Sequence, residues 1–178
     1  NPEIGSSSPF YITNVNDTVY FFANDGVTGN ELWKSDGTAA GTVMVKDIYP
    51  GSLNSFWGSE LIKINETLFF AATDGTNGIE LWKSDKTTTG TVMVKDIYPG
   101  ASSGYPNHFM NVNGTLFFWA NDGVNGYELW KSDGTTIGTV PVKDIYTGVN
   151  SSSPTGALIG STVSYNGLLY FQANDGTN

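Results

Sequence analysis

The amino-acid sequence predicts an all-β protein made of tandem repeats, namely about three and a half four-stranded antiparallel blades of a β-propeller. Three observations indicate this fold class. The sequence Glu-Leu-Trp-Lys-Ser-Asp at 31–36 returns at 80–85 and 128–133, with intervals of 49 and 48 residues. Repeats of this length are typical of propellers and solenoids. The chain also has 22 Gly, which suits short strands with tight turns, and no Cys, which excludes disulfides and thiolate metal sites.

Each repeat is expected to contain four short strands. In the first repeat these are 10–15, 19–23, 31–35 and 42–48. A two-residue turn joins the first two strands, and its Asn-Gly form at 113–114 and 166–167 is a strong hairpin signal because both residues favour positive φ. The second strand is apolar at nearly every position, so we expect both of its faces to be covered.

The order of the strands within a repeat follows from one proline. Pro141 replaces a methionine in the middle of the fourth strand of the third repeat. Proline cannot donate a hydrogen bond to a ladder, so it belongs on an edge strand. The fourth strand is therefore expected to be outermost, and the first strand to be innermost.

The repeats divide the chain into four segments of one repeat domain. We expect three blades at 1–50, 51–99 and 100–147, and a half blade with the first two strands only at 148–178. Propellers normally close with four to eight blades. The sequence thus indicates part of a larger protein, or a ring that other chains complete. An open stack of β-meander repeats is the alternative architecture.

Charge and hydropathy exclude two classes of partner. The formal net charge is −9 and the isoelectric point is about 4.3. Such a chain repels phosphate backbones and anionic lipid, which argues against nucleic acid and membrane surfaces as partners. The sequence contains no run of 18 apolar residues, so we expect no membrane insertion.

The repeat motif resembles that of a known family. The sequence Glu-Leu-Trp-Lys-Ser-Asp-Gly-Thr at 31–38 and again at 128–135 is similar to the bacterial ELWxxDGT repeat family, and Lys86 replaces the glycine in the middle copy. The trailing Gly-Thr-Val-Met-Val-Lys-Asp-Ile at 41–48 has the same character. The resemblance covers almost the whole chain. It implies propeller-like repeats in secreted or cell-surface bacterial proteins, with no defined catalytic activity or ligand.

The loops between the second and third strands are acidic and form a candidate Ca²⁺ site. Each loop begins with Asp-Gly and ends at the glutamate of the third strand, so it offers two carboxylates and several carbonyls. Hard oxygen ligands on a flexible loop suit Ca²⁺. The other interpretation is that Asp-Gly only makes the turn. The candidate ligands are Asp25, Glu31, Asp74, Glu80, Asp122 and Glu128.

The loops that connect successive repeats carry the residues in which the repeats differ most. In an up-and-down sheet these loops emerge on the same side as the acidic loops. Exposed aromatic rings beside polar groups suit carbohydrate binding. The candidate ligand-binding residues are Phe56, Trp57, Tyr105, His108 and Phe109. The alternative is that these rings pack locally on their own blades.

Other candidate residues have structural interpretations. The repeated Trp33, Trp82 and Trp130 are expected to fill the space between neighbouring blades. Trp119 occupies a position that varies between repeats, so we expect a loose or exposed contact there, and it is a candidate interface residue. Asn16, Asn65, Asn113 and Asn150 begin Asn-x-Ser/Thr sequences and are candidate glycosylation sites; the first three also coincide with hairpin turns.

The sequence argues against an enzyme. His108 is the single histidine, cysteine is absent, and the carboxylates recur by repetition rather than as one acid–base pair. Three functions are left. The first is a secreted or cell-surface binding module for adhesion, which binds a glycan or protein with Ca²⁺ as cofactor. The second is a structural spacer or self-assembling unit. The third is a scaffold for a catalytic domain elsewhere.

Overall fold

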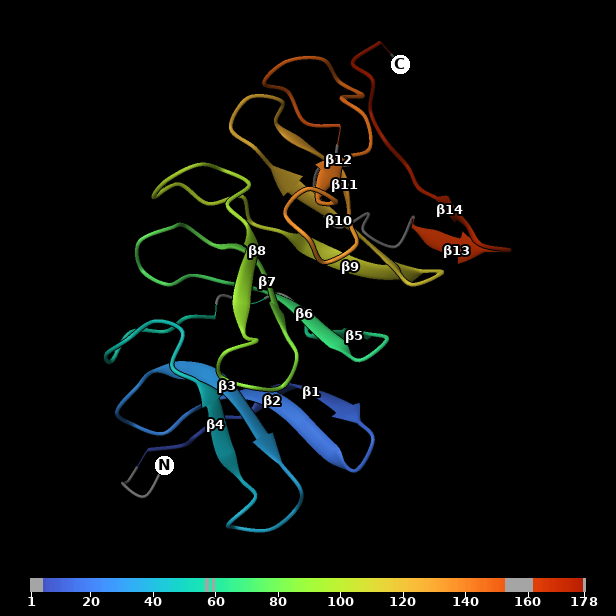
Figure 1. Ribbon diagram of the computed structural model, residues 1–178. Helices are drawn as coiled ribbons and strands as arrows, with labels where there is room; N and C mark the ends of the chain where they lie inside the picture. Colours follow the sequence, from blue (N-terminus) through green and yellow to red (C-terminus); the bar gives the residue numbers. More distant parts are fainter. Residues whose placement is uncertain (1–4, 57, 59, 153–161, 178) are drawn as a thin grey trace.

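The computed structural model describes residues 5–56, 58, 60–152 and 162–177, and these residues form an all-β structure of four antiparallel sheets (Figure 1). The described residues include no helix that could cross a membrane. The first sheet consists of β1 (Phe10–Val15), β2 (Thr18–Asn24), β3 (Asn30–Ser35) and β4 (Val43–Lys46). The second consists of β5 (Ile62–Ile64), β6 (Thr67–Ala72), β7 (Glu80–Ser84) and β8 (Val92–Lys95). The third consists of β9 (Asn107–Val112), β10 (Thr115–Asn121), β11 (Tyr127–Ser132) and β12 (Val140–Pro141), and the fourth of β13 (Val163–Tyr165) and β14 (Leu168–Tyr170).

The strand order confirms the predicted up-and-down meander. In each of the first three sheets, consecutive strands pair in chain order, so the first and fourth strands lie at the two edges. Pro141 lies in β12 and pairs with Trp130 at such an edge, as predicted. The fourth strands are shorter than predicted. β4 ends at Lys46 instead of residue 48, because the N–H of Ile48 donates to a glutamate carboxylate and not to a strand.

The turns between the first and second strands confirm the hairpin prediction. Asn16, Asn65, Asn113 and Asn166 all have φ between 50° and 57°. In the two Asn-Gly turns the glycine also has positive φ, at 82° for Gly114 and 75° for Gly167. Asparagine tolerates this left-handed conformation better than most residues, which explains why it recurs at this position.

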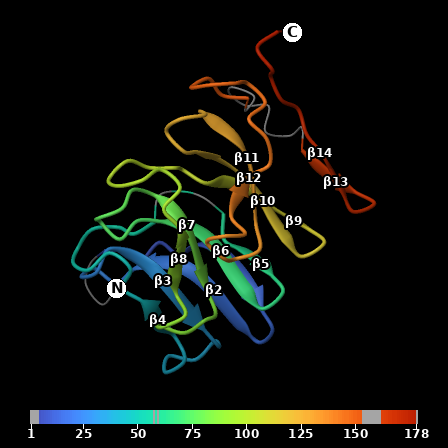
Figure 2. The ribbon, with the colours of Figure 1, turned by 45° about the horizontal axis from the view of Figure 1, so that its top comes forward.

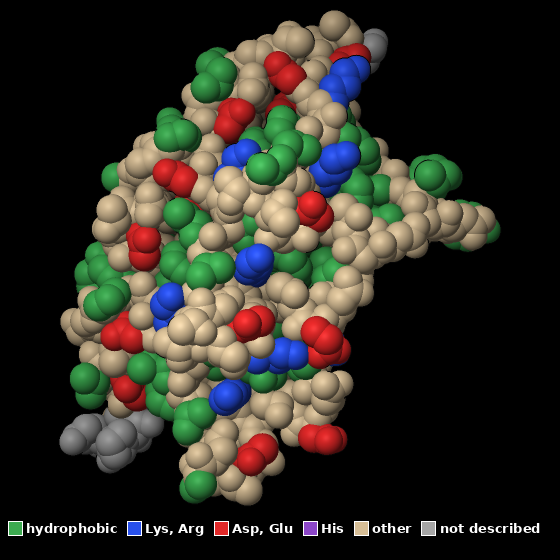
Figure 3. Space-filling view, in the orientation of Figure 1, with side chains coloured by type: hydrophobic (Ala, Val, Ile, Leu, Met, Phe, Trp, Pro, Cys, Tyr) green, Lys and Arg blue, Asp and Glu red, His purple; other side chains and the backbone are tan. Residues whose placement is uncertain are grey.

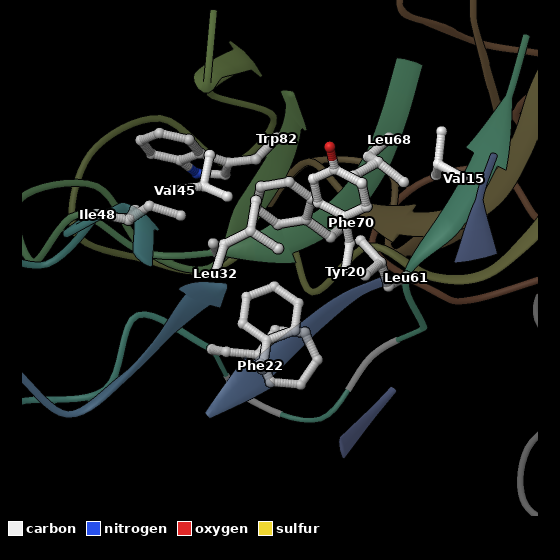
Figure 4. Close-up of a cluster of buried hydrophobic side chains, with 12 residues drawn as sticks. Val15, Tyr20, Phe22, Leu32, Val45, Ile48, Leu61, Leu68, Phe70 and Trp82 are labelled. Carbon is white, nitrogen blue, oxygen red and sulfur yellow. The ribbon is translucent and has the colours of Figure 1, made fainter. Parts of the chain in front are cut away.

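The sheets follow one another in chain order and pack through their faces (Figures 1 and 2). The first strands of neighbouring sheets contact each other, β1 with β5 and β5 with β9. One buried cluster lies between the first and second sheets, and a second cluster lies between the second and third. Figure 4 shows the first cluster, in which Phe22 of β2 and Phe70 of β6 are fully buried. Every residue of β6 after Thr67 is buried, which confirms that a second strand is covered on both faces.

The repeated tryptophans and Trp119 are placed differently from one another. Trp82 and Trp130 are buried between sheets, as predicted, whereas Trp33 of the first sheet is half-buried. The expectation of a loose or exposed Trp119 is wrong. Its side chain is 5% exposed and its ring meets Phe171 edge-on, with 5.9 Å between the centroids. A large ring fills this position because the fourth sheet packs against it.

The loops after the second and fourth strands lie together, as predicted. The N–H of Gly78 donates to the carbonyl of Gly100 (3.1 Å), and the N–H of Ile79 donates to Ser103 Oγ (2.9 Å). A Cβ atom on Gly78 would lie 1.9 Å from the carbonyl oxygen of Ser102, so only glycine fits this close approach. Each pair of loops is therefore a packed unit at one side of its sheet.

Candidate functional site

The most distinctive site in this protein is a buried glutamate at the start of each third strand. Glu31, Glu80 and Glu128 are 0%, 0% and 1% exposed. Carboxylates are seldom buried to this extent without partners. Backbone N–H groups of the segment that leads to the next sheet supply those partners, so the environment of each glutamate is set by its own repeat and by the following loop.

Glu80 illustrates the geometry. Its Oε2 accepts a hydrogen bond from the N–H of Ile97 (2.8 Å), and its Oε1 accepts from the N–H groups of Gly104 (2.7 Å) and Tyr98 (3.4 Å). Ile97 and Tyr98 follow the end of the fourth strand, and Gly104 lies in the loop that enters the third sheet. One carboxylate thus holds a sheet edge and the connection to the next sheet in a fixed relation.

The same arrangement occurs in the other two complete sheets. Glu31 accepts from the N–H of Ile48 (2.8 Å) and from that of Ser55 (3.3 Å). Glu128 accepts from the N–H of Ile145 (3.1 Å) and from the N–H (3.1 Å) and hydroxyl of Ser152. The three glutamates are therefore structural connectors, which the sequence analysis had grouped with the candidate Ca²⁺ ligands.

Burial also affects the ionisation of two of these side chains, Glu31 and Glu80. It raises the pKa of Glu31 and of Glu80 to about 7, while the backbone N–H donors act in the opposite direction. The neighbouring carboxylates of Asp47 and Asp96 add to the increase. The charge of Glu31 and of Glu80 consequently changes close to neutral pH.

The aspartates of the acidic loops have a separate set of partners. Asp74 Oδ1 accepts from the N–H groups of Thr76 (2.9 Å) and Asn77 (2.8 Å), and Oδ2 accepts from Asn77 Nδ2 (2.9 Å). Burial favours the neutral form of Asp74, but these hydrogen bonds together outweigh it and lower the pKa. Asp25 and Asp122 close their loops in the same way. Each of these aspartates therefore makes a turn.

The proposed Ca²⁺ pairs are not assembled into a ligand group. Among the described residues, no three or more histidine or carboxylate side chains gather as metal ligands. The aspartate of each pair bonds within its own loop, and the glutamate bonds to the connection behind it. Three aspartates that were not among the candidate Ca²⁺ ligands have an oxygen without a partner. Asp47, Asp96 and Asp144 each have a buried Oδ1 with no hydrogen-bond partner. The repeated Val-Lys-Asp-Ile sequence is the signal that could have identified them.

Two of the candidate ligand-binding aromatics belong to the core, so the expectation that they are exposed is wrong for both. Phe56 is 4% exposed and its ring stacks on Phe22 with 3.9 Å between centroids. Phe109 is 7% exposed and meets Phe118 edge-on at 6.0 Å. Phe56 lies in a connecting loop, whereas Phe109 and His108 lie in β9 and not in the loop where they were expected. Both phenylalanine rings pack on second strands, where they gain more from burial than from exposure. Trp57 lies outside the described residues.

The other two candidates lie nearer the surface. Tyr105 is 51% exposed, and His108 is half-buried. His108 borders an open hollow of about 230 Å³ together with Glu60, Phe109, Met110 and Thr162. Glu60 Oε2 accepts the N–H of Phe109 (2.8 Å) there. This hollow is smaller than the pockets of 300–1,000 Å³ that usually hold small ligands.

Lysines that the sequence analysis did not select join neighbouring sheets. Lys46 Nζ donates to the carbonyl of Thr91 (2.7 Å) and lies 5.9 Å from the ring centre of Trp82. Lys95 repeats both contacts one sheet later, with the carbonyl of Thr139 (2.9 Å) and with Trp130 (5.7 Å). The signal for these contacts was the lysine that recurs three residues after the start of each fourth strand.

Neither the charged side chains on the face in Figure 3 nor the candidate glycosylation asparagines form a recognisable binding site. On the face shown in Figure 3, acidic and basic side chains are interspersed, without a large patch of one sign. Asn16, Asn65 and Asn113 occupy exposed hairpin turns, and Asn150 lies in an exposed loop. Turn geometry explains the positions of the first three.

Comparisons of the chain with models of known protein families, with curated proteins and with solved structures find no match. The functional interpretation therefore depends on the chain's own residues and geometry.

Proposed function

We propose that this chain is a non-enzymatic structural repeat module, a scaffold of propeller-type blades in a secreted or cell-surface protein. The observation that carries the proposal is the buried glutamate of each complete sheet, which lies in a third strand and accepts hydrogen bonds from the segment that connects the end of its sheet to the next sheet. The most unusual polar residues of the chain are thus used to connect sheets.

The arrangement of the sheets supports a propeller-type organisation. The first strands β1, β5 and β9 contact their neighbours, and the fourth strands form the opposite edges of the sheets. Such a pattern is what a radial arrangement requires, with first strands at the centre and fourth strands at the rim. The similarity of residues 31–38 to the ELWxxDGT repeat supports a location outside the cell.

A ligand-binding module for a glycan or protein is the second candidate function. Tyr105 favours it, because its ring is exposed on a loop. The orphan oxygens of Asp47, Asp96 and Asp144 favour assistance by Ca²⁺, because an unpaired buried carboxylate oxygen is a ready ligand for that ion. The scaffold is the preferred function because Phe56 and Phe109, two of the candidate ligand-binding rings, are buried in the core.

Thermal unfolding of the purified chain in EDTA, in millimolar Ca²⁺ and in millimolar Mg²⁺ distinguishes the two functions. An ion that binds only to the folded state raises the melting temperature of the protein. For a scaffold we expect equal melting temperatures in the three solutions. Glu80→Ala should remove about 3 kcal/mol of stability because three backbone donors lose their acceptor, whereas Tyr105→Ala should have little effect.

The opposite result would move the assignment to a binding module. It consists of a Ca²⁺-specific increase in melting temperature that Asp96→Asn removes, together with binding on a glycan array that Tyr105→Ala abolishes. Asp17→Asn is the matched control, since it removes one carboxylate from an exposed hairpin turn.

A further inference from the structure

The hollow beside β9 contains an imidazole and a carboxylate, two of the groups that bind transition-metal ions in proteins. His108 of β9 and Glu60, which precedes β5, both border this hollow of about 230 Å³. Glu60 Oε2 accepts the N–H of Phe109, so its carboxylate lies within one residue of the imidazole along β9. The two side chains come from the second and third sheets, and the packing of those sheets brings them together.

The repeat explains why these two residues meet. Glu60 lies 48 residues before His108, which is also the interval between Trp82 and Trp130. The two residues therefore occupy equivalent places in consecutive repeats, close to the first strands of their sheets. First strands contact each other, as β5 does with β9. Side chains from equivalent positions next to these strands consequently border the same hollow.

Hydrogen bonds around His108 determine which ring nitrogen is free. Asn107 Nδ2 donates to the carbonyl of Tyr105 (2.7 Å), and this bond fixes the orientation of the amide because a carbonyl can only accept. Asn107 Oδ1 consequently accepts a hydrogen bond from His108 Nδ1. The lone pair of the neutral imidazole is then on Nε2, which has no hydrogen-bond partner among the described residues. Metal-binding histidines have this arrangement, in which the other ring nitrogen donates to a fixed acceptor.

The backbone at His108 has a conformation that histidine seldom adopts. Its φ is 55°, and the pairing of β9 with β10 shifts at this point, between Phe117 and Trp119. A bulge of this kind usually has glycine in the left-handed position, because a side chain there costs energy. Bulges also redirect the side chain of the extra residue. The third sheet thus presents an imidazole beside Glu60 at a position where glycine would be more stable.

The loop before β9 holds the histidine and its asparagine in place. The N–H of Gly104 donates to Glu80 Oε1 (2.7 Å), and the N–H of Tyr105 donates to the carbonyl of Ile79 (3.1 Å). Both acceptors lie at or just before the start of β7. The carbonyl of Tyr105 that orients Asn107 is therefore attached to the second sheet. A site that the fold positions in advance loses less conformational entropy when a ligand binds.

We propose that His108 Nε2 and the carboxylate of Glu60 bind a divalent transition-metal ion, such as Zn²⁺ or Cu²⁺, in this hollow. The inference goes beyond the proposed scaffold function and does not depend on it. Imidazole nitrogen is a ligand for these ions, whereas Ca²⁺ takes oxygen ligands, so this site is distinct from the candidate Ca²⁺ residues. Water completes the coordination, since the hollow is open. Cu²⁺ binds more tightly than Zn²⁺ to a given set of nitrogen and oxygen ligands.

NMR spectroscopy of the intact chain tests the proposal directly, because His108 is the single histidine and its imidazole signals report on this site alone. In mildly alkaline buffer without metal, a long-range ¹H–¹⁵N spectrum should show the neutral ring with its proton on Nδ1. One equivalent of Zn²⁺ should shift the Nε2 resonance and leave the proton on Nδ1. Calorimetric titration should give one-to-one binding of Zn²⁺ and tighter binding of Cu²⁺.

Substitutions separate the ligands from the residue that orients them. His108→Gln should abolish Zn²⁺ binding, and Glu60→Gln, which keeps an acceptor for the N–H of Phe109, should weaken it at least tenfold. Asn107→Ala should weaken binding about tenfold and should also move the imidazole proton from Nδ1 toward Nε2 in the NMR spectrum. Glu66→Gln is the matched control, since it removes an exposed carboxylate from the hairpin turn of the same sheet, and it should leave the affinity unchanged.

Three results would overturn the proposal: no change of the His108 signals with Zn²⁺, equal affinity of His108→Gln and wild-type proteins, or equal affinity of Glu60→Gln and wild-type proteins. Thermal unfolding in EDTA checks that each variant is folded. If His108→Gln does not fold, the wild-type NMR titration decides, because it needs no substitution. The melting experiments on Glu80 and Tyr105 contain no transition metal, so failure here is separable from failure of the scaffold function.

Discussion

The interface between the second and third sheets and the interface between the third and fourth sheets use equivalent residues with different results. Phe118 of β10 is fully buried against the second sheet, whereas Phe171, at the same repeat position, is half-buried against the third. Both interfaces keep the backbone hydrogen bond that docks a second strand on the preceding loop. They differ in the third and fourth strands, which the second interface lacks among the described residues.

This difference shows what each half of a sheet contributes. The first two strands fix the position and direction of a sheet, as the bond from Asn174 to Ser152 shows. The third and fourth strands seal the interface, since they bring the tryptophan, the buried glutamate and the threonine-rich loop. Burial of apolar area is the main favourable term in folding. Both halves supply it, since Phe70 of a second strand and Trp82 of a third strand belong to the same buried cluster.

Removing the equivalent phenylalanine from each interface is the most severe test of this comparison. We expect Phe118→Ala to cost about 3–5 kcal/mol, because the ring is fully buried. Phe171→Ala should cost about 1 kcal/mol, because its ring is already partly in water. Denaturant unfolding of the two variants measures both values. Equal losses would show that the fourth sheet is as well sealed as the third.

Glu31 and Glu80 predict a pH dependence of stability that belongs to the first two sheets. In the folded protein burial raises the pKa of Glu80 to about 7, above the ordinary value of 4.5. Between these values the folded state holds a proton that the unfolded chain has lost. The free energy of unfolding should therefore decrease as pH rises from about 4.5 to 7. Glu31 contributes in the same direction.

Denaturant unfolding at several pH values between 4.5 and 8 checks this dependence. Glu80→Gln should flatten the slope by about half, since Glu31 continues to titrate. Glu66→Gln is a suitable control, because hydrogen bonds from Lys86 and Lys63 lower the pKa of this exposed carboxyl and take its titration below the window. An identical slope in wild type and Glu80→Gln would contradict the assignment to the buried connectors.

Repetition explains how much of the fold was predictable from the sequence. Strand order, hairpin turns and the edge position of Pro141 all follow from local signals such as Asn-Gly and proline chemistry. Local signals do not report which residues a neighbouring sheet covers. Trp119 looked variable and was expected to be exposed, yet Phe171 from another repeat buries it. The propeller-type arrangement itself stays a prediction.

The candidate site was harder to predict for the same reason. Glu80 and Asp74 are six positions apart and appeared to be one pair of Ca²⁺ ligands. The glutamate, however, starts a strand, and its partners lie 17–24 residues further along the chain. Because the two residues are close in sequence, they suggested one site, but in the fold Asp74 and Glu80 have separate sets of partners. Exposure of Phe56 was misjudged similarly, because nothing in the loop sequence indicates that the ring stacks on Phe22.

The smallest expected effect concerns one turn in which the second sheet differs from its neighbours. Lys86 has φ of 80°, where the first and third sheets have Gly37 at 89° and Gly134 at 86°. A side chain in this left-handed region costs about 1 kcal/mol relative to glycine. Lys86 also forms an exposed ion pair with Glu66 (2.9 Å), which adds little stability.

Comparison of Lys86→Gly with Lys86→Ala isolates the backbone strain, because both variants lose the ion pair and only alanine keeps the Cβ atom. We expect the glycine variant to be more stable by about 1 kcal/mol in denaturant unfolding. Equal stability of the two variants would mean that the turn relaxes around alanine, and the departure from the glycine of the repeat would then carry no energetic penalty.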